Sequence, residues 1–369
     1  MAHESLGHSP DGGGVSPAAH RPDVVLVTGG AGFIGSHLIR WILEHEPRVR
    51  VINLDLLTYS GNLASLADVN ARFGHEGEGR YFFVRGDIRD VKLVASLLEG
   101  GAVGASTGSV LPAPDTIMHL AAQSHVDRSI AGPEEFVSTN VQGTLNVLMC
   151  ARSELAARPR PFRIVNASTD EVYGSMSAEA KPADEDAPLR PNSPYAASKA
   201  GADCLVRAFA NTYALPCLTT RSSNNYGPNQ FPEKLIPLMI VRALADEALP
   251  VYGDGMQVRD WLHVLDHASA LWAVCTRGDL LDEVYNVSAE VQVANIDLVA
   301  RILRALRKPE TLVRHVTDRA GHDRRYALDS SRLRSKLGWA PAHELDSGLK
   351  DTIDWYVMHQ DWWRDLAPR

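Results

Sequence analysis

The 369-residue chain lacks the features that mark secreted, membrane-spanning and nucleic-acid-binding proteins. Its N-terminus has no apolar stretch of the kind that forms a secretory signal, and no apolar run reaches the length of a membrane span. Lys and Arg number 37 against 45 Asp and Glu, and no basic stripe stands out. We therefore expect neither a membrane nor a nucleic acid as a partner.

Cysteine is also scarce, and none of it is arranged in a C-x-x-C pair. The four residues are Cys150, Cys204, Cys217 and Cys275. Isolated cysteines are typical of buried thiols in a reducing compartment. We therefore expect a cytoplasmic protein without a metal site.

The overall composition is that of a globular protein, with 45% hydrophobic and 22% charged residues. The length allows one large domain or two. Residues 1–22 contain a run of three glycines and little that could pack, which predicts a disordered extension. Residues 100–114 are rich in Gly, Ser, Ala and Pro and predict a surface loop.

A short apolar run at 23–27 predicts a buried strand, and a glycine-rich turn follows it. Gly29, Gly32 and Gly35 are spaced G-x-x-G-x-x-G, and Phe33 and Ile34 open a helical pattern. Such a sequence can also form a plain turn, but here strand, turn and helix follow in the order that a dinucleotide site needs. Glycine permits a close backbone approach, and the helix N-terminus then meets a pyrophosphate.

Two further strands end in carboxylates. The strand at 49–54 leads to Asp55, which lies 20 residues after Gly35, where a carboxylate would hold the adenosine ribose. A carboxylate there repels a 2′-phosphate, so NAD is favoured over NADP. The strand at 81–84 leads to Asp87, which we expect near the adenine, although a turn Asp is an alternative.

Two more predicted strands complete a parallel sheet. The strand at 116–120 is followed by small residues, and the strand at 162–167 delivers Ser168 and Thr169. A long helical pattern covers about 134–155. Alternating strands and helices predict a parallel sheet, whose ligands bind at the carboxyl ends of the strands.

Tyr195 and Lys199 lie four residues apart, so they share one face of a predicted helix. An ammonium group beside a phenol favours the phenolate, which can act as a base. Thr169 offers a hydroxyl nearby, and Asp170 and Glu171 offer a possible acid and base at the same strand end. Tyr-x-x-x-Lys alone also occurs in ordinary amphipathic helices. Because this chain also carries the dinucleotide motif, we predict that Tyr195 and Lys199 are a catalytic pair.

Taken together, these motifs resemble the dTDP-glucose 4,6-dehydratases, a family of the extended short-chain dehydrogenase/reductase superfamily. The resemblance covers about residues 23 to 358. The segments that carry it are 28–35, 55–62, 125–130, 168–174, 195–199, 223–228, 231–237, 259–262 and 321–326. The chain departs from the family at Gln123, where Glu is usual, and at Ala320, where Pro is usual.

The resemblance implies an α/β fold with a Rossmann-type, doubly wound parallel sheet and a smaller C-terminal α/β lobe for the substrate. The NAD-binding domain would span about 23–222 and the sugar-nucleotide lobe about 223–369, with the chain crossing between them more than once. It also implies a homodimer that forms through the helices at about 134–155 and 195–213.

The resemblance further implies the reaction. Tyr195 would take the proton from the sugar 4-hydroxyl while hydride passes from C4 to NAD, and Lys199 would lower the pKa of Tyr195 and hold the nicotinamide ribose. Glu171 would remove the C5 proton, and Asp170 would protonate the departing 6-hydroxyl. Hydride would then return to C6, while Thr169 hydrogen-bonds the 4-oxygen.

The expected cofactor residues lie mainly at the strand ends. They are Gly29, Gly32, Phe33, Ile34, Gly35, Asp55, Leu56, Thr58, Asp87, Ile88, Leu120, Ala121, Ala122, Ser124, Thr139, Tyr195, Lys199 and Asn225. The expected substrate residues are Ser124, Thr169, Asn224, Lys234, Leu235, Pro250, Tyr252, Arg259, Asn286, Arg319 and His322. Arg259 and Arg319 would bind the diphosphate, because a guanidinium matches phosphate oxygens.

Three alternatives stay open at this point. The same chemistry could act on UDP-glucose or UDP-N-acetylglucosamine, because these residues do not indicate which nucleotide base is preferred. A sugar-nucleotide 4-epimerase would need Tyr195 and Lys199 but would have no task for Asp170 and Glu171. A non-catalytic dinucleotide-binding sensor would retain NAD without turnover.

Overall fold

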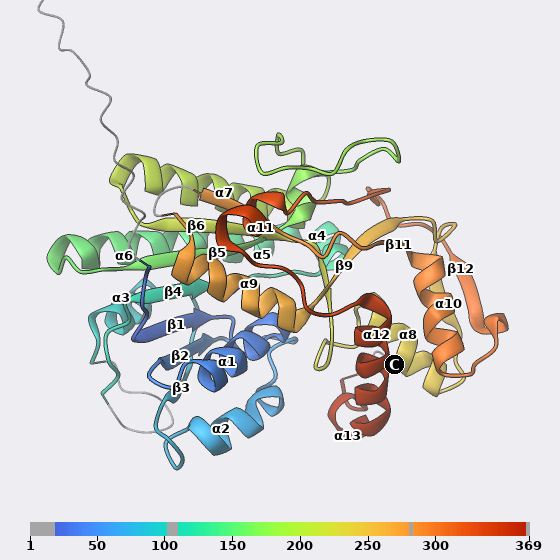
Figure 1. The fold of residues 1–369 in the computed structure, drawn as a ribbon, viewed down its shortest axis with the longest axis horizontal. Coiled ribbons are helices and arrows are strands. Elements are labelled where there is room, and N and C mark those ends of the chain that lie inside the picture. The colour runs from blue at the N-terminus through green and yellow to red at the C-terminus, as the bar shows by residue number, and fades with distance from the viewer. Residues whose placement is uncertain (1–18, 102–109, 280–282, 367–369) are drawn as a thin grey trace, which may run out of the picture.

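The computed structural model describes residues 19–101, 110–279 and 283–366, which form a large lobe and a smaller one (Figure 1). Residues 1–18 of the predicted extension and residues 102–109 of the predicted loop lie outside the described residues. At 19–22 the chain is described, and the backbone N–H of His20 donates to the carbonyl of Thr276.

The large lobe is built on a seven-stranded sheet in the order β10-β6-β5-β4-β1-β2-β3. Every pairing in this sheet is parallel, as predicted. Its strands are β1 (Val24–Thr28), β2 (Arg50–Asp55), β3 (Tyr81–Arg85), β4 (Thr116–His119), β5 (Arg163–Thr169), β6 (Cys217–Ser222) and β10 (Glu283–Val287).

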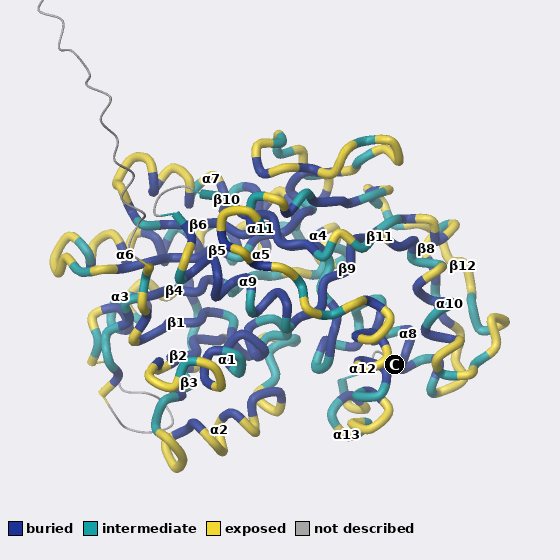
Figure 2. The backbone as a smooth tube through the Cα atoms, viewed as in Figure 1, coloured by how far each residue is buried: buried dark blue, intermediate teal, exposed yellow. Residues whose placement is uncertain are grey.

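Helices cover both faces of this sheet, as a doubly wound fold requires (Figure 1). Val25 and Val27 of β1 belong to the apolar core on one face, and Val24 and Leu26 belong to the core on the other. Figure 2 shows the strands as buried between the two layers. The first face carries α1 (Phe33–His45), α9 (Val264–Arg277) and α11 (Ser331–Leu337), and the second carries α3 (Val91–Glu99), α6 (Thr144–Ala157) and α7 (Pro194–Tyr213).

Two segments leave the sheet as short helices. The chain after β2 forms η1 (Leu63–Leu66) and α2 (Ala67–Phe73), and the chain after β4 forms α4 (Val126–Ala131) and α5 (Pro133–Phe136). The predicted helix at 134–155 is confirmed, but its middle is a π-helix, η2 (Val137–Gly143), that leads directly into α6. π-Helical turns are frequent at functional sites.

The smaller lobe has its own apolar core, to which Ile240, Leu298 and Tyr356 belong. It contains a three-stranded sheet in the order β11-β9-β7 and a strand pair, β12-β8. Its elements are β7 (Asn224–Tyr226), α8 (Leu235–Leu244), β8 (Leu249–Tyr252), β9 (Val258–His263), β11 (Gln292–Ala294), α10 (Asn295–Ala305), η4 (Glu310–Leu312), β12 (Val313–Val316), α12 (Leu345–Met358) and α13 (Gln360–Trp363). Because α9 and β10 return to the large sheet, the two lobes are not separate stretches of sequence.

The turn between β1 and α1 brings the backbone of Gly29 against the loop that follows β4. Gly29 has φ +73°, and a Cβ there would lie 2.7 Å from the Cα of Ala121. A Cβ at Gly35 would lie 2.3 Å from the carbonyl oxygen of Gly29. Glycine is therefore required here both for backbone conformation and for space.

We expect Gly29→Ala to lower the free energy of unfolding by about 2–4 kcal/mol, because it adds a left-handed backbone penalty and a clash with Ala121. Gly79→Ala is the matched control, since Gly79 has φ +69° but open space around its Cβ position. Its cost should be about 1–2 kcal/mol, the backbone term alone. Urea denaturation of both variants measures the difference, and equal losses would contradict the close approach.

Candidate active site

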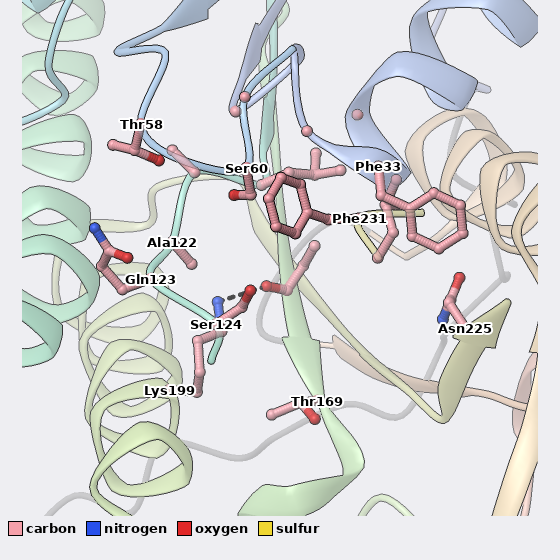
Figure 3. Close-up of a pocket in the computed structure, with 18 of the residues that line it drawn as sticks. Phe33, Thr58, Ser60, Ala122, Gln123, Ser124, Thr169, Lys199, Asn225 and Phe231 are labelled. Carbon is pink, nitrogen blue, oxygen red and sulfur yellow. Dashed lines mark hydrogen bonds between the residues drawn. The ribbon is translucent and has the colours of Figure 1, made fainter. Parts of the chain in front are cut away.

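A cavity of about 320 Å³ lies at the carboxyl ends of the large sheet and reaches the smaller lobe. Strand order reverses between β1 and β4, and ligands of open α/β sheets bind at such a switch point. All five predicted catalytic residues and all the predicted cofactor residues line this cavity. In Figure 3, Phe33, Ser60 and Phe231 lie toward one end, and Thr169 and Lys199 toward the other.

The end of the cavity beside α1 fits a pyrophosphate. Gly32 is the N-cap of α1, and no side chain caps this helix. Gly32, Phe33 and Ile34 line the cavity, so the free N–H groups of a 13-residue helix begin at its wall. Free N–H groups and the helix dipole favour a negatively charged ligand at this place.

Asp55 lies at the end of β2 on the same side. Its carboxylate accepts hydrogen bonds from the backbone N–H of Ala31 at 2.9 Å and of Leu57 at 2.7 Å. Burial raises the pKa of Asp55, and these two bonds oppose the shift. The carboxylate is thus fixed between the two loops that would hold the adenosine.

Asp87 lines the cavity after β3, but its carboxylate is already paired. The guanidinium of Arg89 donates to Oδ2 of Asp87 from Nε at 2.9 Å and from Nη2 at 2.7 Å, and Nε also approaches Oδ1 at 3.1 Å. Although burial acts in the opposite direction, the hydrogen bonds from Arg89 hold the pKa of Asp87 below its usual value. Its predicted contact with an adenine stays a prediction.

Asn140 of the π-helix η2 fixes the loop after β4. Its side chain accepts from the N–H of Gln123 at 2.8 Å and donates to the carbonyl of Gln123 at 3.0 Å. It also donates to the hydroxyl of Ser198 in α7 at 2.8 Å. One buried amide therefore ties the cavity floor to the helix that carries Tyr195 and Lys199.

Tyr195 and Lys199 lie in the first turns of α7, which begins at Pro194 after the N-cap Ser193. The ammonium of Lys199 donates to the carbonyl of Ala167 on β5 at 2.7 Å. Burial raises the pKa of Tyr195, with the charge of Glu171 as the next cause, and burial lowers the pKa of Lys199. A hydrogen bond with Thr169 lowers the pKa of Tyr195, but burial outweighs it. The predicted lowering by Lys199 stays a prediction.

Thr169, Asp170 and Glu171 stand at the end of β5, where the strand passes into the 3-10 turn η3 (Asp170–Tyr173). The Thr169 hydroxyl accepts from the N–H of Glu171 and donates to one oxygen of Asp170, both at 3.3 Å. The other Asp170 oxygen, Oδ2, is buried without a protein partner. A carboxyl group in this position is suited to keep a proton and to make contact with a ligand.

The two carboxyls differ in their electrostatic surroundings. Burial raises the pKa of Asp170 well above its usual value, and the charges of Glu171 and Asp260 raise it further. Burial also raises the pKa of Glu171, but three neighbouring cations oppose this shift. Such a difference is what an acid and a base need when they are neighbours.

The three cations come from the smaller lobe and approach Glu171 from that side: Arg259, Lys234 and Arg319. Arg259 is buried and donates to the carbonyls of Val258 at 2.8 Å and Asp323 at 2.9 Å. Lys234 donates to the carbonyl of Ser124 at 3.2 Å. The cations could therefore offset the charges of a diphosphate beside the carboxyls.

Some of the predicted substrate residues line the cavity, and others lie outside its lining. Ser124, Thr169, Asn224 and Lys234 line the cavity. Tyr252, Arg319 and His322 form a cluster beyond its lining, with the Arg319 guanidinium 5.1 Å and the His322 ring 6.1 Å from the Tyr252 ring. Leu235 opens α8, and Pro250 precedes Tyr252 on β8.

Asn286 is placed differently from the other predicted substrate residues. It is 0% exposed on β10 and accepts from the Tyr173 hydroxyl at 2.8 Å. Its amide also donates to the carbonyls of Ala183 at 2.9 Å and Asp329 at 3.2 Å. Both ends of the side chain are engaged, so it supports β10 and does not face a ligand in the cavity.

Several lining residues were not among the predicted site residues. His267 on α9 bonds the Asn225 side chain through Nδ1 at 2.9 Å, while its Nε2 is buried without a partner. Nothing in the sequence around His267 signals this. Phe231 and Glu233 also line the cavity. They belong to the proline-containing segment 231–237, whose sequence could have indicated them as site residues.

These features fit a dinucleotide better than a metal. The glycine turn leaves no room for side chains, the α1 N-terminus is uncapped, and polar atoms such as Asp170 Oδ2 and His267 Nε2 face no protein partner. Among the described residues, no group of three or more His, Cys, Asp or Glu could hold a metal ion.

No helix in the described part of the chain is both long and apolar enough to span a bilayer.

Fold and site together define a dinucleotide-dependent enzyme of the short-chain dehydrogenase/reductase class. The family model described as GDP-mannose 4,6 dehydratase matches residues 26–352. The chain is 49% identical to the dTDP-glucose 4,6-dehydratase of Xanthomonas campestris pv. campestris (strain B100), over 91% of this chain and 94% of that protein. It belongs to the dTDP-glucose 4,6-dehydratase family.

Solved structures agree with this assignment. The dTDP-glucose 4,6-dehydratase DesIV of Streptomyces venezuelae, crystallised with NAD bound, superposes with a TM-score of 0.84 at 44% identity, covering 93% of this chain and 99% of that one. A UDP-glucose 4-epimerase of Thermotoga maritima gives a TM-score of 0.78 at 27% identity, covering 91% of this chain and 99% of that one.

The raised pKa of Asp170 predicts a stability gain in Asp170→Asn. The folded protein binds this proton more tightly than the unfolded chain, so ionisation of Asp170 destabilises the fold as pH rises above about 4. Asparagine removes that cost. The urea midpoint of the variant should exceed that of the wild type near neutral pH, and the gain should vanish below about pH 4.

The exposed Asp361 supplies the control for this measurement, because Asp361→Asn should leave the urea midpoint unchanged. A gain in Asp170→Asn that does not depend on pH would contradict the assignment of a proton to Asp170.

Proposed function

We propose that this protein is an NAD-dependent dTDP-glucose 4,6-dehydratase, which converts dTDP-glucose to dTDP-4-keto-6-deoxyglucose and water. The observation that carries the proposal is a pair of buried carboxyl groups, Asp170 and Glu171, which lie beside Tyr195 in a dinucleotide cavity. Neighbouring negative charges raise the pKa of Asp170 further, whereas neighbouring cations oppose the rise in the pKa of Glu171. The names of the similar proteins support the same substrate.

The residues that would hold NAD are those of the glycine turn, Asp55 and Lys199. When bound, NAD supplies a hydride acceptor and a positively charged nicotinamide ring. Tyr195 takes the proton of the sugar 4-hydroxyl, and Thr169 hydrogen-bonds the 4-oxygen. The cationic ring and Lys199 favour the phenolate that burial alone disfavours in Tyr195.

Water loss then uses the two carboxyls. The 4-ketone acidifies the C5 hydrogen, and Glu171 removes that proton. Asp170 donates its proton to the departing 6-hydroxyl, which leaves as water. The C5=C6 bond formed in this way is reduced by hydride at C6 and by a proton at C5, so the cofactor ends in its starting state. The protein supplies positions and charges for these steps.

A 4-epimerase is the second candidate, because the Thermotoga maritima enzyme shares the fold. Epimerisation needs a base and a bound dinucleotide but no acid for a departing hydroxyl. The buried carboxyl of Asp170, with its partner-free oxygen, and the neighbouring carboxyl of Glu171 have no role in that reaction. The carboxyl pair therefore favours the dehydratase.

Substrate and reaction are tested together by incubating the protein with dTDP-glucose, UDP-glucose and UDP-N-acetylglucosamine separately, in deuterated solvent, with the products followed by mass spectrometry. We expect loss of one water and gain of one C5 deuterium from dTDP-glucose alone. The same change with a UDP sugar would keep the mechanism and replace the substrate. Interconversion of 4-epimers without water loss would contradict the proposal.

We further infer that the protein acts as a cytoplasmic homodimer. None of its four cysteines forms a disulfide, which fits a reducing compartment. Met149 of α6 is 53% exposed, and Ala197, Cys204 and Ala208 of the adjoining α7 are also exposed. Small and apolar residues on two neighbouring helices allow close packing against the same pair in a second copy.

Sedimentation equilibrium should give twice the 40.3 kDa mass of the chain. Ala208→Arg should shift the protein toward the monomer, because it places a charge at the proposed contact. Lys350→Ala on α12 is a control that should leave the mass unchanged. A monomeric wild type, or a variant that remains a dimer, would contradict this contact.

A further inference from the structure

Three segments that are distant in sequence meet beside the cavity. The Tyr59 hydroxyl, in the loop after β2, donates to a carboxylate oxygen of Glu233, before α8, at 2.9 Å. The guanidinium carbon of Arg128 in α4 lies 3.5 Å from the centre of the Tyr59 ring. Arg128 also approaches the other Glu233 oxygen at 3.6 Å. We call Tyr59, Arg128 and Glu233 the latch.

The latch stands between the cavity and solvent. Glu233, Ser60 and Phe231 line the cavity. Ser60 is the neighbour of Tyr59 in the chain, and the Phe231 ring meets the Tyr59 ring edge-on, with 5.5 Å between the ring centres. On the outer side, the Arg128 side chain is 52% exposed. The loop after β2 and the segment before α8 therefore close the cavity wall by contacts with each other.

The latch contacts are stronger than those of a typical surface ion pair. The Glu233 side chain is only 9% exposed, so solvent screens its charge poorly. Burial and the Glu233 charge raise the pKa of Tyr59, so its hydroxyl remains a hydrogen-bond donor. The Arg128 guanidinium adds a cation–π contact on the ring face.

We propose that the latch retains NAD in the cavity between turnovers. This inference rests on the proposed function, because a reaction that restores its cofactor does not require cofactor exchange. The loop that carries Tyr59 begins at Asp55 and also places Leu56, Thr58 and Ser60 on the cavity. The latch joins this loop to the smaller lobe, and a cofactor leaving past that loop requires the Tyr59–Glu233 bond to break.

The test measures NAD release and not turnover. Protein loaded with ring-deuterated NAD is mixed with excess unlabelled NAD, and the bound label is followed by mass spectrometry after rapid desalting. Tyr59→Phe keeps the ring and removes only the hydroxyl. We expect it to release NAD at least about tenfold faster than the wild type, the factor that loss of a hydrogen bond to a charged acceptor implies.

A double variant separates the latch from general loosening. If the Tyr59 hydroxyl acts through Glu233, adding Tyr59→Phe to Glu233→Ala should not speed release beyond that of Glu233→Ala alone. Tyr213→Phe is the matched control: Tyr213 also lies under an arginine, Arg152 at 3.8 Å, but at the end of α7 outside the cavity lining. Its NAD release should equal that of the wild type.

Wild-type release rates in both Tyr59→Phe and Glu233→Ala would overturn the inference, and so would effects that multiply in the double variant. In either case NAD binding and water loss by the wild type would leave the proposed function standing. A wild-type protein that takes up no labelled NAD would instead overturn the proposed function, and the latch with it. Thermal unfolding of each variant verifies that the fold is intact.

Discussion

Burial of two adjacent carboxyl groups at the end of β5 is the constraint on which the rest of the site depends. Charged groups are costly to remove from water unless they are paired or protonated. The two carboxyls avoid this cost in different ways. Burial raises the pKa of Asp170 so that it keeps its proton, while neighbouring cations stabilise the charge of Glu171. The same backbone turn thus presents an acid and a base side by side.

This division needs both lobes. The large sheet places Asp170 and Glu171 next to Tyr195, but the cations near Glu171 belong to the smaller lobe. The carboxyl pair therefore has its unequal character only while the lobes stay together. The hydrogen bond between Tyr59 and Glu233 in the latch joins the same two lobes.

Much of this arrangement was readable from sequence, because it depends on local patterns. The strand at 23–27, the glycine turn and Tyr195-x-x-x-Lys199 each fix their own backbone, and parallel topology brings their ends together. Asn286 shows the limit: the family resemblance implied a substrate contact, yet three long-range partners engage its side chain inside the protein. His267 and the π-helical Asn140 were missed for the same reason, since their roles arise from tertiary contacts.

The division of labour between the two carboxyls is tested most directly by comparing Asp170→Asn and Glu171→Gln with dTDP-glucose in deuterated solvent. The account predicts that Asp170→Asn still exchanges the C5 hydrogen but loses water at least about 100-fold more slowly, as expected when a general acid is removed. Glu171→Gln should still oxidise C4 but exchange C5 far more slowly. Full turnover by Asp170→Asn, or unimpaired C5 exchange by Glu171→Gln, would contradict it.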